Sequence, residues 1–339
     1  MKKYLIAMML LAVTTLGCSE NVELIVQPSY YDPYPLAFYN AFWEQKIPDI
    51  TFKITNPMGR PITVKITSEY VGISNPAVST LVIPPKETLI VNQTIPLILE
   101  KIKEIRSKTK ICLHYKVEYR NGDDWKTWCE QTVMVDVYPL DVMVWVLNCK
   151  DGRRINMQDY IAVFVTPNDR SVQELLAKAK KYAPNRELKG ARGKVLPQIE
   201  AIYKALKYEY NVSYVNTPFT YGRDIVQRVR LPAESLKLKA MNCVDGAVLF
   251  ASAIEALGFR PFIVLLPDHA FVAWIDPNDG MMYALETTLI NSSFMDALNR
   301  GLNELNENWK NLTDDSPWNG YLVDVKACRD VGIVPLPLD

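Results

Sequence analysis

Short segments in which apolar and polar residues alternate follow one another from residue 22 to about residue 140, and this pattern constrains the fold most strongly. The alternating segments include Ile50–Ile54, Ile62–Ile66, Ile111–Tyr119 and Thr132–Tyr138. Turn-forming residues stand between them, at 56–61 and 121–124. Because successive side chains of a strand point to opposite faces, each segment offers one apolar face to a core. Short strands separated by turns predict an all-β sandwich of the immunoglobulin-like type over residues 19–140.

The pattern changes near residue 140, where helical spacing begins to alternate with apolar strands. Residues 142–147 predict one more buried strand, and Asn168 or Asp169 can cap the helix that follows. A second helix is expected from about Val195 to Lys207. We therefore expect an α+β protein whose second domain, residues 141–339, combines helices and strands.

Size and charge are consistent with two domains and exclude one class of partner. A chain of 339 residues and 38.6 kDa is long enough for two cores. The 38 basic and 38 acidic residues cancel, and the basic residues form no stripe. Nucleic-acid binding relies on clustered positive charge, so we expect no nucleic-acid partner.

The N-terminus has the composition of a secretion signal. Lys2 and Lys3 precede the apolar run Leu5–Leu16, which is too short to span a bilayer. A signal peptide of this kind directs the chain out of the cytoplasm. Disulfides are permitted in the compartment that the chain then enters.

The end of this run, Thr15-Leu16-Gly17-Cys18, resembles a bacterial lipobox, although leucine is usual where Thr15 stands. The resemblance implies that residues 1–18 are a lipoprotein signal peptide and that Cys18 is acylated. The protein would then be a membrane-anchored lipoprotein of the bacterial cell envelope. Ser19 points to the periplasmic side of the outer membrane if the organism is Gram-negative. The alternative is an ordinary secretory cleavage in which Cys18 has no such role.

The remaining cysteines allow a disulfide but predict no metal site. Cys112 and Cys129 lie on successive strand-like segments, and a bridge between them is the first candidate. The chain has no Cys-x-x-Cys spacing, and two histidines are too few for the usual zinc site. We therefore expect no structural metal.

Cys243 stands at the start of a helical pattern. Apolar residues recur at helical spacing from Val244 to Leu257, and Gly258 ends the helix. A thiol at a helix N-terminus faces the positive end of the helix dipole and unpaired amides, which favour the thiolate. The same amides can stabilise an oxyanion on a carbonyl that the thiolate attacks. The alternative is a small buried core cysteine, the commonest fate of a free cysteine.

His269, one of only two histidines, begins a strand-like segment 26 residues after the cysteine. It follows the apolar strand Pro261–Leu266, and a third strand is expected from Met281 to Thr287, after a turn at 276–280. A nucleophile and a base in this order are the residue types that thiol chemistry needs. The alternative is a structural histidine.

The predicted hairpin selects a partner for the histidine. If residue 276 opposes residue 281, then Glu286 is a diagonal neighbour of His269 on the same face of the sheet. Glu286 is thus placed to orient the imidazole, as the third group of a catalytic triad does. Asp276 lies at an odd separation from His269 and faces the other side, and Asp268 also points elsewhere.

Three segments together resemble the core of the transglutaminase-like superfamily. They are Asn242-Cys243-Val244-Asp245-Gly246, Pro267-Asp268-His269-Ala270-Phe271-Val272 and Ala284-Leu285-Glu286-Thr287-Thr288. The resemblance covers residues 225–290, and extends less closely to about 160 and 330. It implies a papain-like fold in which a helix and the adjoining sheet carry a Cys-His-Asp triad.

By this resemblance, Cys243 is the nucleophile, His269 the general base and acid, and Glu286 the residue that orients the histidine. Gln227 is a candidate oxyanion donor, because the fold often uses a polar side chain ahead of the cysteine. The chain departs from the family at Glu286, where aspartate is usual, and at Met241, since many relatives place glycine nearby.

The resemblance implies a thiol hydrolase or acyltransferase that acts on an amide or peptide bond through a Cys243 thioester, without metal or organic cofactor. Its substrate would be a protein or peptide of the cell envelope. Bacterial relatives are more often assigned as proteases than as cross-linking enzymes, so hydrolysis is the leading expectation. The alternatives are a non-catalytic binding module, in which the β-domain recognises envelope protein or glycan, and a scaffold in a surface assembly.

Overall fold

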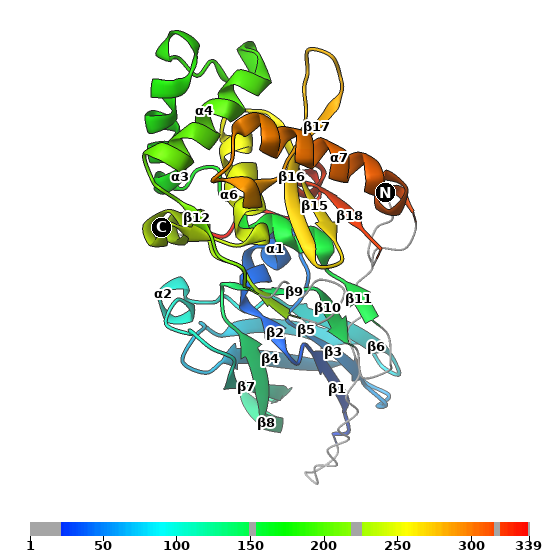
Figure 1. Cartoon of the computed structure of the whole chain (residues 1–339). Helices are drawn as coiled ribbons and strands as arrows, with labels where there is room; N and C mark the ends of the chain where they lie inside the picture. The colour runs from blue at the N-terminus through cyan, green and yellow to red at the C-terminus, as the bar shows by residue number, and fades with distance from the viewer. Residues whose placement is uncertain (1–21, 149–153, 218–225, 315–318, 338–339) are drawn as a thin grey trace. The chain divides into compact units, whose positions relative to one another are not determined.

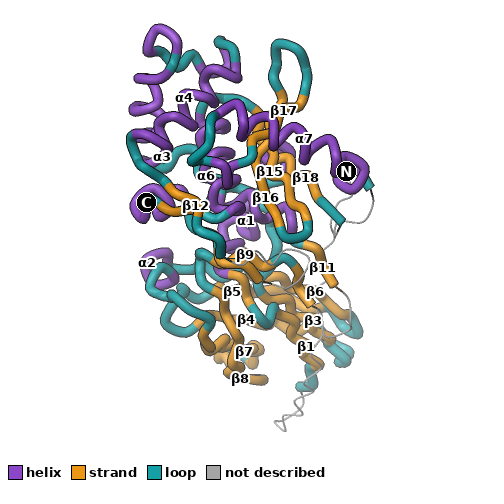
Figure 2. Tube along the Cα trace, viewed as in Figure 1, coloured by secondary structure: helices purple, strands orange, loops and turns teal. Residues whose placement is uncertain are grey.

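The computed structural model describes residues 22–148, 154–217, 226–314 and 319–337, and it separates into two compact units (Figure 1). The first unit comprises residues 1–140 and 148–155, and the second comprises residues 141–147 and 156–339. The predicted signal peptide and Cys18 lie outside the described residues. The predicted α+β class is confirmed (Figure 2). Among the described residues, no helix combines the length and the apolar character needed to cross a bilayer.

Two sheets face each other in the first unit. The antiparallel three-stranded sheet contains, in spatial order, β1 (Ile25–Tyr30), β3 (Ile50–Thr55) and β6 (Thr88–Gln93). The five-stranded sheet contains, in spatial order, β2 (Tyr34–Pro35), β8 (Asp124–Tyr138), β7 (Thr109–Asn121), β4 (Ile62–Tyr70) and β5 (Ala77–Ile83). The short helices are η1 (Leu36–Phe38), α1 (Tyr39–Glu44) and α2 (Leu99–Ile102).

The alternation predicted from the sequence explains the core of this unit. Every second residue of β4, from Ile62 to Tyr70, is buried. Side chains of the two sheets meet across the core, where the rings of Phe52 and Tyr115 lie 5.6 Å apart and Ser68 Oγ donates to Gln93 Oε1 at 2.6 Å. This part of the chain is therefore a β-sandwich.

The predicted disulfide between Cys112 and Cys129 is wrong. The register of β7 and β8 pairs Cys112 with Met134 and Cys129 with Val117, and no disulfide joins the two residues. The two cysteines are thus separated by five residues along the hairpin, about 17 Å, whereas a disulfide needs Cα atoms within about 7 Å.

Asp49 is a buried carboxyl group in this unit, and it predicts a pH-dependent stability. It accepts hydrogen bonds from the Tyr34 hydroxyl and the Ile95 amide, each at 2.6 Å. Burial raises the pKa of Asp49 from 3.8 to about 7, although these two hydrogen bonds lower it. The protonated form is therefore favoured by folding, so the stabilisation is complete below about pH 4 and is lost as the pH rises through about 7.

We expect the first unit to lose up to a few kcal/mol of unfolding free energy between pH 5 and pH 8, and Asp49→Asn to flatten this dependence. Urea unfolding at the two pH values, followed by tryptophan fluorescence, measures the difference. Asp136→Asn is the matched control, because Asp136 is ion-paired at the surface to Lys108 and Lys110. Equal slopes for the wild type and Asp49→Asn would contradict the prediction.

The second unit is built around an antiparallel sheet in the order β17-β16-β15-β18. Its strands are β15 (Arg260–Leu266), β16 (His269–Ile275), β17 (Met282–Leu285) and β18 (Tyr321–Asp324). Shorter strands are β9 (Val142–Val144), β12 (Ser213–Tyr214), β13 (Val226–Arg228) and β14 (Ala240–Met241). Strands β10 (Val146–Asn148) and β11 (Arg154–Asn156) each have residues in both units. The α-helices are α3 (Arg170–Ala179), α4 (Val195–Tyr208), α5 (Pro232–Leu238), α6 (Cys243–Ala256), α7 (Phe294–Thr313) and α8 (Val325–Asp330). The 3₁₀ helices are η2 (Gln158–Phe164), η3 (Lys180–Tyr182), η4 (Pro184–Arg186), η5 (Gly190–Arg192) and η6 (Thr287–Leu289).

The helices predicted from the sequence are present. Asp169 caps α3 by accepting a hydrogen bond from the Ser171 amide at 2.7 Å, and α4 covers the predicted second helix. Strands β15 and β16 are buried along almost their whole length, as expected for strands covered on both faces. Helix α6 packs against these two strands, and α7 packs against β17 and β18.

Two glycines allow α6 to lie close to η6 and α7 to lie close to the end of β17. A Cβ atom at Gly246 of α6 would lie 2.7 Å from Thr287 Oγ1. A Cβ atom at Gly301 of α7 would lie 2.7 Å from backbone atoms of Ala284 and Leu285. The residue that follows Leu285 is therefore enclosed by both helices, and this residue is Glu286.

Candidate active site

Cys243 is the first residue of α6 and is buried, with 3% of its surface exposed. Asn242 caps the helix: its side chain accepts a hydrogen bond from the Asp245 amide at 2.9 Å, and Asp245 accepts one in return from the Asn242 amide at 3.0 Å. Asp245 also accepts hydrogen bonds from the backbone amide and the guanidinium of Arg230, at 2.8 and 2.9 Å. The capping box thus fixes the position of the thiol and ties it to the loop before α5.

His269 and Glu286 form the contact that the sequence predicted. Ile275 pairs with Met282 and Val272 with Leu285, which is the predicted hairpin register. His269 Nε2 lies 2.5 Å from Glu286 Oε2. The predicted strand over 281–287 is too long, because β17 ends at Leu285 and Glu286 caps the 3₁₀ helix η6.

Glu286 is held by two further donors. Its Oε1 atom accepts hydrogen bonds from the Thr288 amide at 2.8 Å and from the Thr288 hydroxyl at 2.6 Å. Burial raises the pKa of Glu286, but the hydrogen bond and charge of His269 and the Thr288 donors outweigh it and lower the pKa overall. The carboxylate therefore stays ionised beside the imidazole.

The neighbours of His269 raise its pKa. Burial lowers the pKa of His269, but hydrogen bonds to Cys243 and Glu286 and the charges of Glu286 and Glu304 raise it from 6.5 to about 10. An imidazolium hydrogen-bonded to a thiol at a helix N-terminus stabilises the thiolate form of that thiol. The structure thus brings Cys243, His269 and Glu286 together at the start of α6.

Two further residues lie in this neighbourhood and were not predicted from the sequence. Glu304 of α7 lies with its Oε2 atom 3.5 Å from His269 Nε2. Tyr214 lies near Cys243 and Glu286: burial, and then the charges of these two groups, raise the pKa of its hydroxyl. One signal was available for Glu304, because it is a charged residue within the buried stripe of α7, beside Gly301 and Leu305.

Gln227, the candidate oxyanion donor, lies on β13 opposite Met143 of β9 and is buried. Its side-chain amide donates to the backbone carbonyl of Arg228 at 3.0 Å. The backbone amides at the start of α6 therefore have the stronger structural claim to an oxyanion, and the role of Gln227 stays a prediction.

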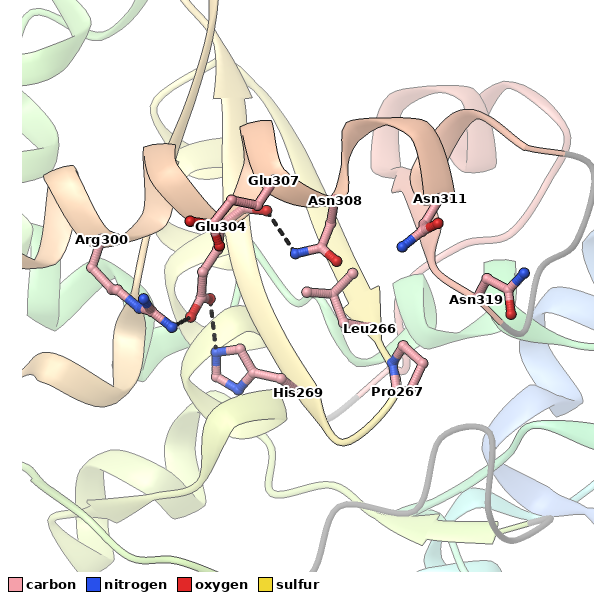
Figure 3. A pocket seen from close by; sticks show the side chains of 9 residues that line it. All are labelled: Leu266, Pro267, His269, Arg300, Glu304, Glu307, Asn308, Asn311 and Asn319. Atoms are coloured by element: carbon pink, nitrogen blue, oxygen red, sulfur yellow. Dashed lines mark hydrogen bonds and ion pairs between the residues drawn. The ribbon is translucent and has the colours of Figure 1, made fainter.

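A cavity of about 510 Å³ adjoins the histidine, between α7 and the turn that joins β15 to β16 (Figure 3). Leu266, Pro267 and His269 line it on the sheet side. Polar side chains line the rest of it: Arg300, Glu304, Glu307, Asn308, Asn311 and Asn319. The cavity gives polar molecules a route to the imidazole.

Among the described residues, three side chains beside this cavity have the spacing of a cation site. Ligand atoms of His269, Glu286 and Glu304 all lie within 4.8 Å of one another. The expectation that the protein needs no metal or organic cofactor stays a prediction.

Comparison with protein-family models and with curated proteins finds no match for this chain.

Proposed function

We propose that the protein is a thiol hydrolase or acyltransferase that cleaves an amide or peptide bond through a Cys243 thioester. One observation carries this proposal: Cys243, the first residue of α6, lies beside His269 and contributes to its raised pKa, and His269 Nε2 lies 2.5 Å from the buried Glu286 carboxylate. The three residues supply a nucleophile, a base and a group that orients the base, with the base between the other two. We further propose that the second unit has a papain-like, transglutaminase-like fold and the first an immunoglobulin-like fold.

The proposed reaction has two halves. The Cys243 thiolate attacks the carbonyl carbon, and the amides at the start of α6 stabilise the oxyanion. His269 then donates its proton to the nitrogen as the C–N bond breaks, leaving a thioester and a free amine. In hydrolysis, His269 accepts a proton from water as the water oxygen attacks the thioester; the C–S bond then breaks, which releases the acid and restores the Cys243 thiolate beside the protonated His269. An amine in place of water gives transfer instead.

The proposed setting follows from the N-terminal sequence. A lipidated Cys18 would tether the protein to a bacterial envelope membrane, so its substrates would be envelope proteins or peptides. The formal net charge of zero argues against a nucleic-acid partner.

A second candidate function is a non-catalytic binding or scaffold module. The observation that favours it is the burial of Cys243, which leaves only 3% of the residue accessible to a substrate. In this case the triad would be a stabilising network within the unit.

Iodoacetamide labelling, read for each cysteine by mass spectrometry, separates the two functions. We expect Cys243 to react at neutral pH roughly tenfold or more faster than a free thiol peptide, because its thiolate is stabilised. Cys328→Ala is the matched control for Cys243→Ala, since Cys328 is also buried, but its thiol lies beside the Asp159 carbonyl. A peptide-amide library should then show turnover that Cys243→Ala abolishes and Cys328→Ala retains. Slow labelling of Cys243 with no turnover would favour the binding module.

A further inference from the structure

A second carboxylate faces the side of His269 that Glu286 occupies. Glu304 lies one helical turn beyond Arg300 on α7, with 8% of its surface exposed. Its Oε1 atom forms an ion pair with Arg300, and its Oε2 atom lies 3.5 Å from His269 Nε2. Among the described residues, nothing donates a hydrogen bond to this buried Oε2 atom.

The facing oxygen of Glu304 lacks a hydrogen-bond donor among the described residues. His269 Nε2 carries a single N–H, and Glu286 Oε2 at 2.5 Å is the nearer acceptor. Glu304 Oε2 at 3.5 Å is beyond a good hydrogen bond from the same nitrogen. The other oxygen of Glu286 accepts from Thr288, so no donor is left for the facing oxygen of Glu304. A buried acceptor without a donor is costly.

We propose that Glu304 is a positioning residue of the site, and that at rest it carries a proton which it shares with Glu286. A proton between the two carboxyl groups supplies the missing donor and removes one of two like charges. Two carboxylates that share a buried site do not both ionise readily, and one of them keeps its proton.

Some groups around Glu304 raise its pKa and others lower it. Burial and the Glu286 carboxylate of the β17–η6 segment raise the pKa of Glu304, whereas His269 of β16 and Arg300 of α7 lower it, and the net direction is upward. Glu307, one turn further along α7, is exposed on the wall of the cavity. A raised pKa favours the protonated form of Glu304, and this proton is the donor that the buried oxygen lacks.

The catalytic meaning of this proton rests on the proposed function. While Glu304 is neutral, one carboxylate holds the imidazolium proton that the leaving amine must receive. Ionisation of Glu304 adds a second negative charge beside the imidazolium, which holds that proton more tightly and makes His269 a weaker acid. Glu304 would thus set the upper pH limit of the reaction.

Histidine NMR on the full chain tests the proposal without a substrate. In a His114→Gln background, ¹³C-labelled histidine reports on His269 alone, because the chain has only these two histidines. We expect two inflections in the pH titration of the His269 ring signal, one for Glu304 and one for His269 itself. Glu304→Gln should remove the first inflection and leave the signal at lower pH unchanged, since the amide mimics the protonated acid.

Three outcomes overturn the proposal. A single inflection in the wild type would show that Glu304 does not titrate beside His269. A fall of about one unit or more in the His269 pKa in Glu304→Gln, with no first inflection in the wild type, would show an ionised Glu304 at rest. A stoichiometric metal that EDTA removes from the wild type but that is missing from Glu304→Gln would show a cation in place of the proton.

Glu307→Gln is the matched control, because it removes a carboxylate one turn away and should leave both inflections in place. The titration is independent of turnover: two inflections without reactivity of Cys243 would support the shared proton and refute the proposed function. The reverse result would refute the shared proton alone. If Glu304→Gln does not fold, a single inflection in the wild type still overturns the proposal.

Discussion

Replacing His269 with glutamine is expected to slow the alkylation of Cys243 about 30-fold at pH 7. The thiolate is the reactive form, and a neighbouring imidazolium stabilises it, whereas a free thiol with an ordinary pKa near 8.5 is only about 3% thiolate at this pH. Glutamine keeps a polar side chain in the place of the ring but offers no positive charge. The rate of iodoacetamide incorporation at Cys243, followed by mass spectrometry between pH 5 and pH 9, measures this loss.

The same substitution should also reduce kcat/KM on any amide substrate by about 10²- to 10⁴-fold, because the leaving amine loses its proton donor. His114→Gln is the matched control: His114 lies on β7 in the first unit, beside Glu69 and Glu130, and its loss should change neither rate. If His269→Gln and the wild type label at the same rate, His269 does not activate the thiol.

Replacing Gly301 with alanine is expected to cost about 1–3 kcal/mol of unfolding free energy. The new methyl group would lie 2.7 Å from the backbone of Ala284 and Leu285, which cannot rotate away as a side chain can. Alanine favours a helix over glycine by about 1 kcal/mol, so the steric cost must exceed that gain. Urea unfolding measures the net change.

Gly301→Ala should disturb the site as well as the stability, because α7 carries Glu304 and the contacted strand ends next to Glu286. A lower rate of Cys243 labelling in the folded variant is the expected sign. Gly59→Ala is the control, since no atom lies within 4 Å of a Cβ atom at that position. An unchanged or higher stability of Gly301→Ala would show that α7 can move away from β17 without loss.

The hairpin that carries the site could be predicted because its rule is local. A turn of four residues after Asp276 determines which residues of β16 and β17 face each other, and that parity selects Glu286 and rejects Asp276. The disulfide between Cys112 and Cys129 was predicted without a register, only from their place on successive strand-like segments. Their hairpin contains an irregularity between Val117 and Glu118, and even without it the two cysteines are far apart in the register.

Residues that reach the site from a distant element could not be predicted in this way. Glu304 stands on α7, and no local spacing indicates which strand that helix will cover. A charged residue in the apolar stripe of α7 was the one local sign, and it indicates a buried charge without naming its partner.

Glu286 performs two mechanical tasks with one carboxylate, since one oxygen fastens η6 through Thr288 while the other holds the imidazole. His269 and η6 are therefore attached to the same carboxylate, so a movement of η6 would also shift the imidazole. The longer arm of glutamate suits this double attachment, because the chain has already left the sheet at Leu285. An aspartate here would keep the charge but lose about 1.5 Å of reach, so it would have to release one of the two attachments.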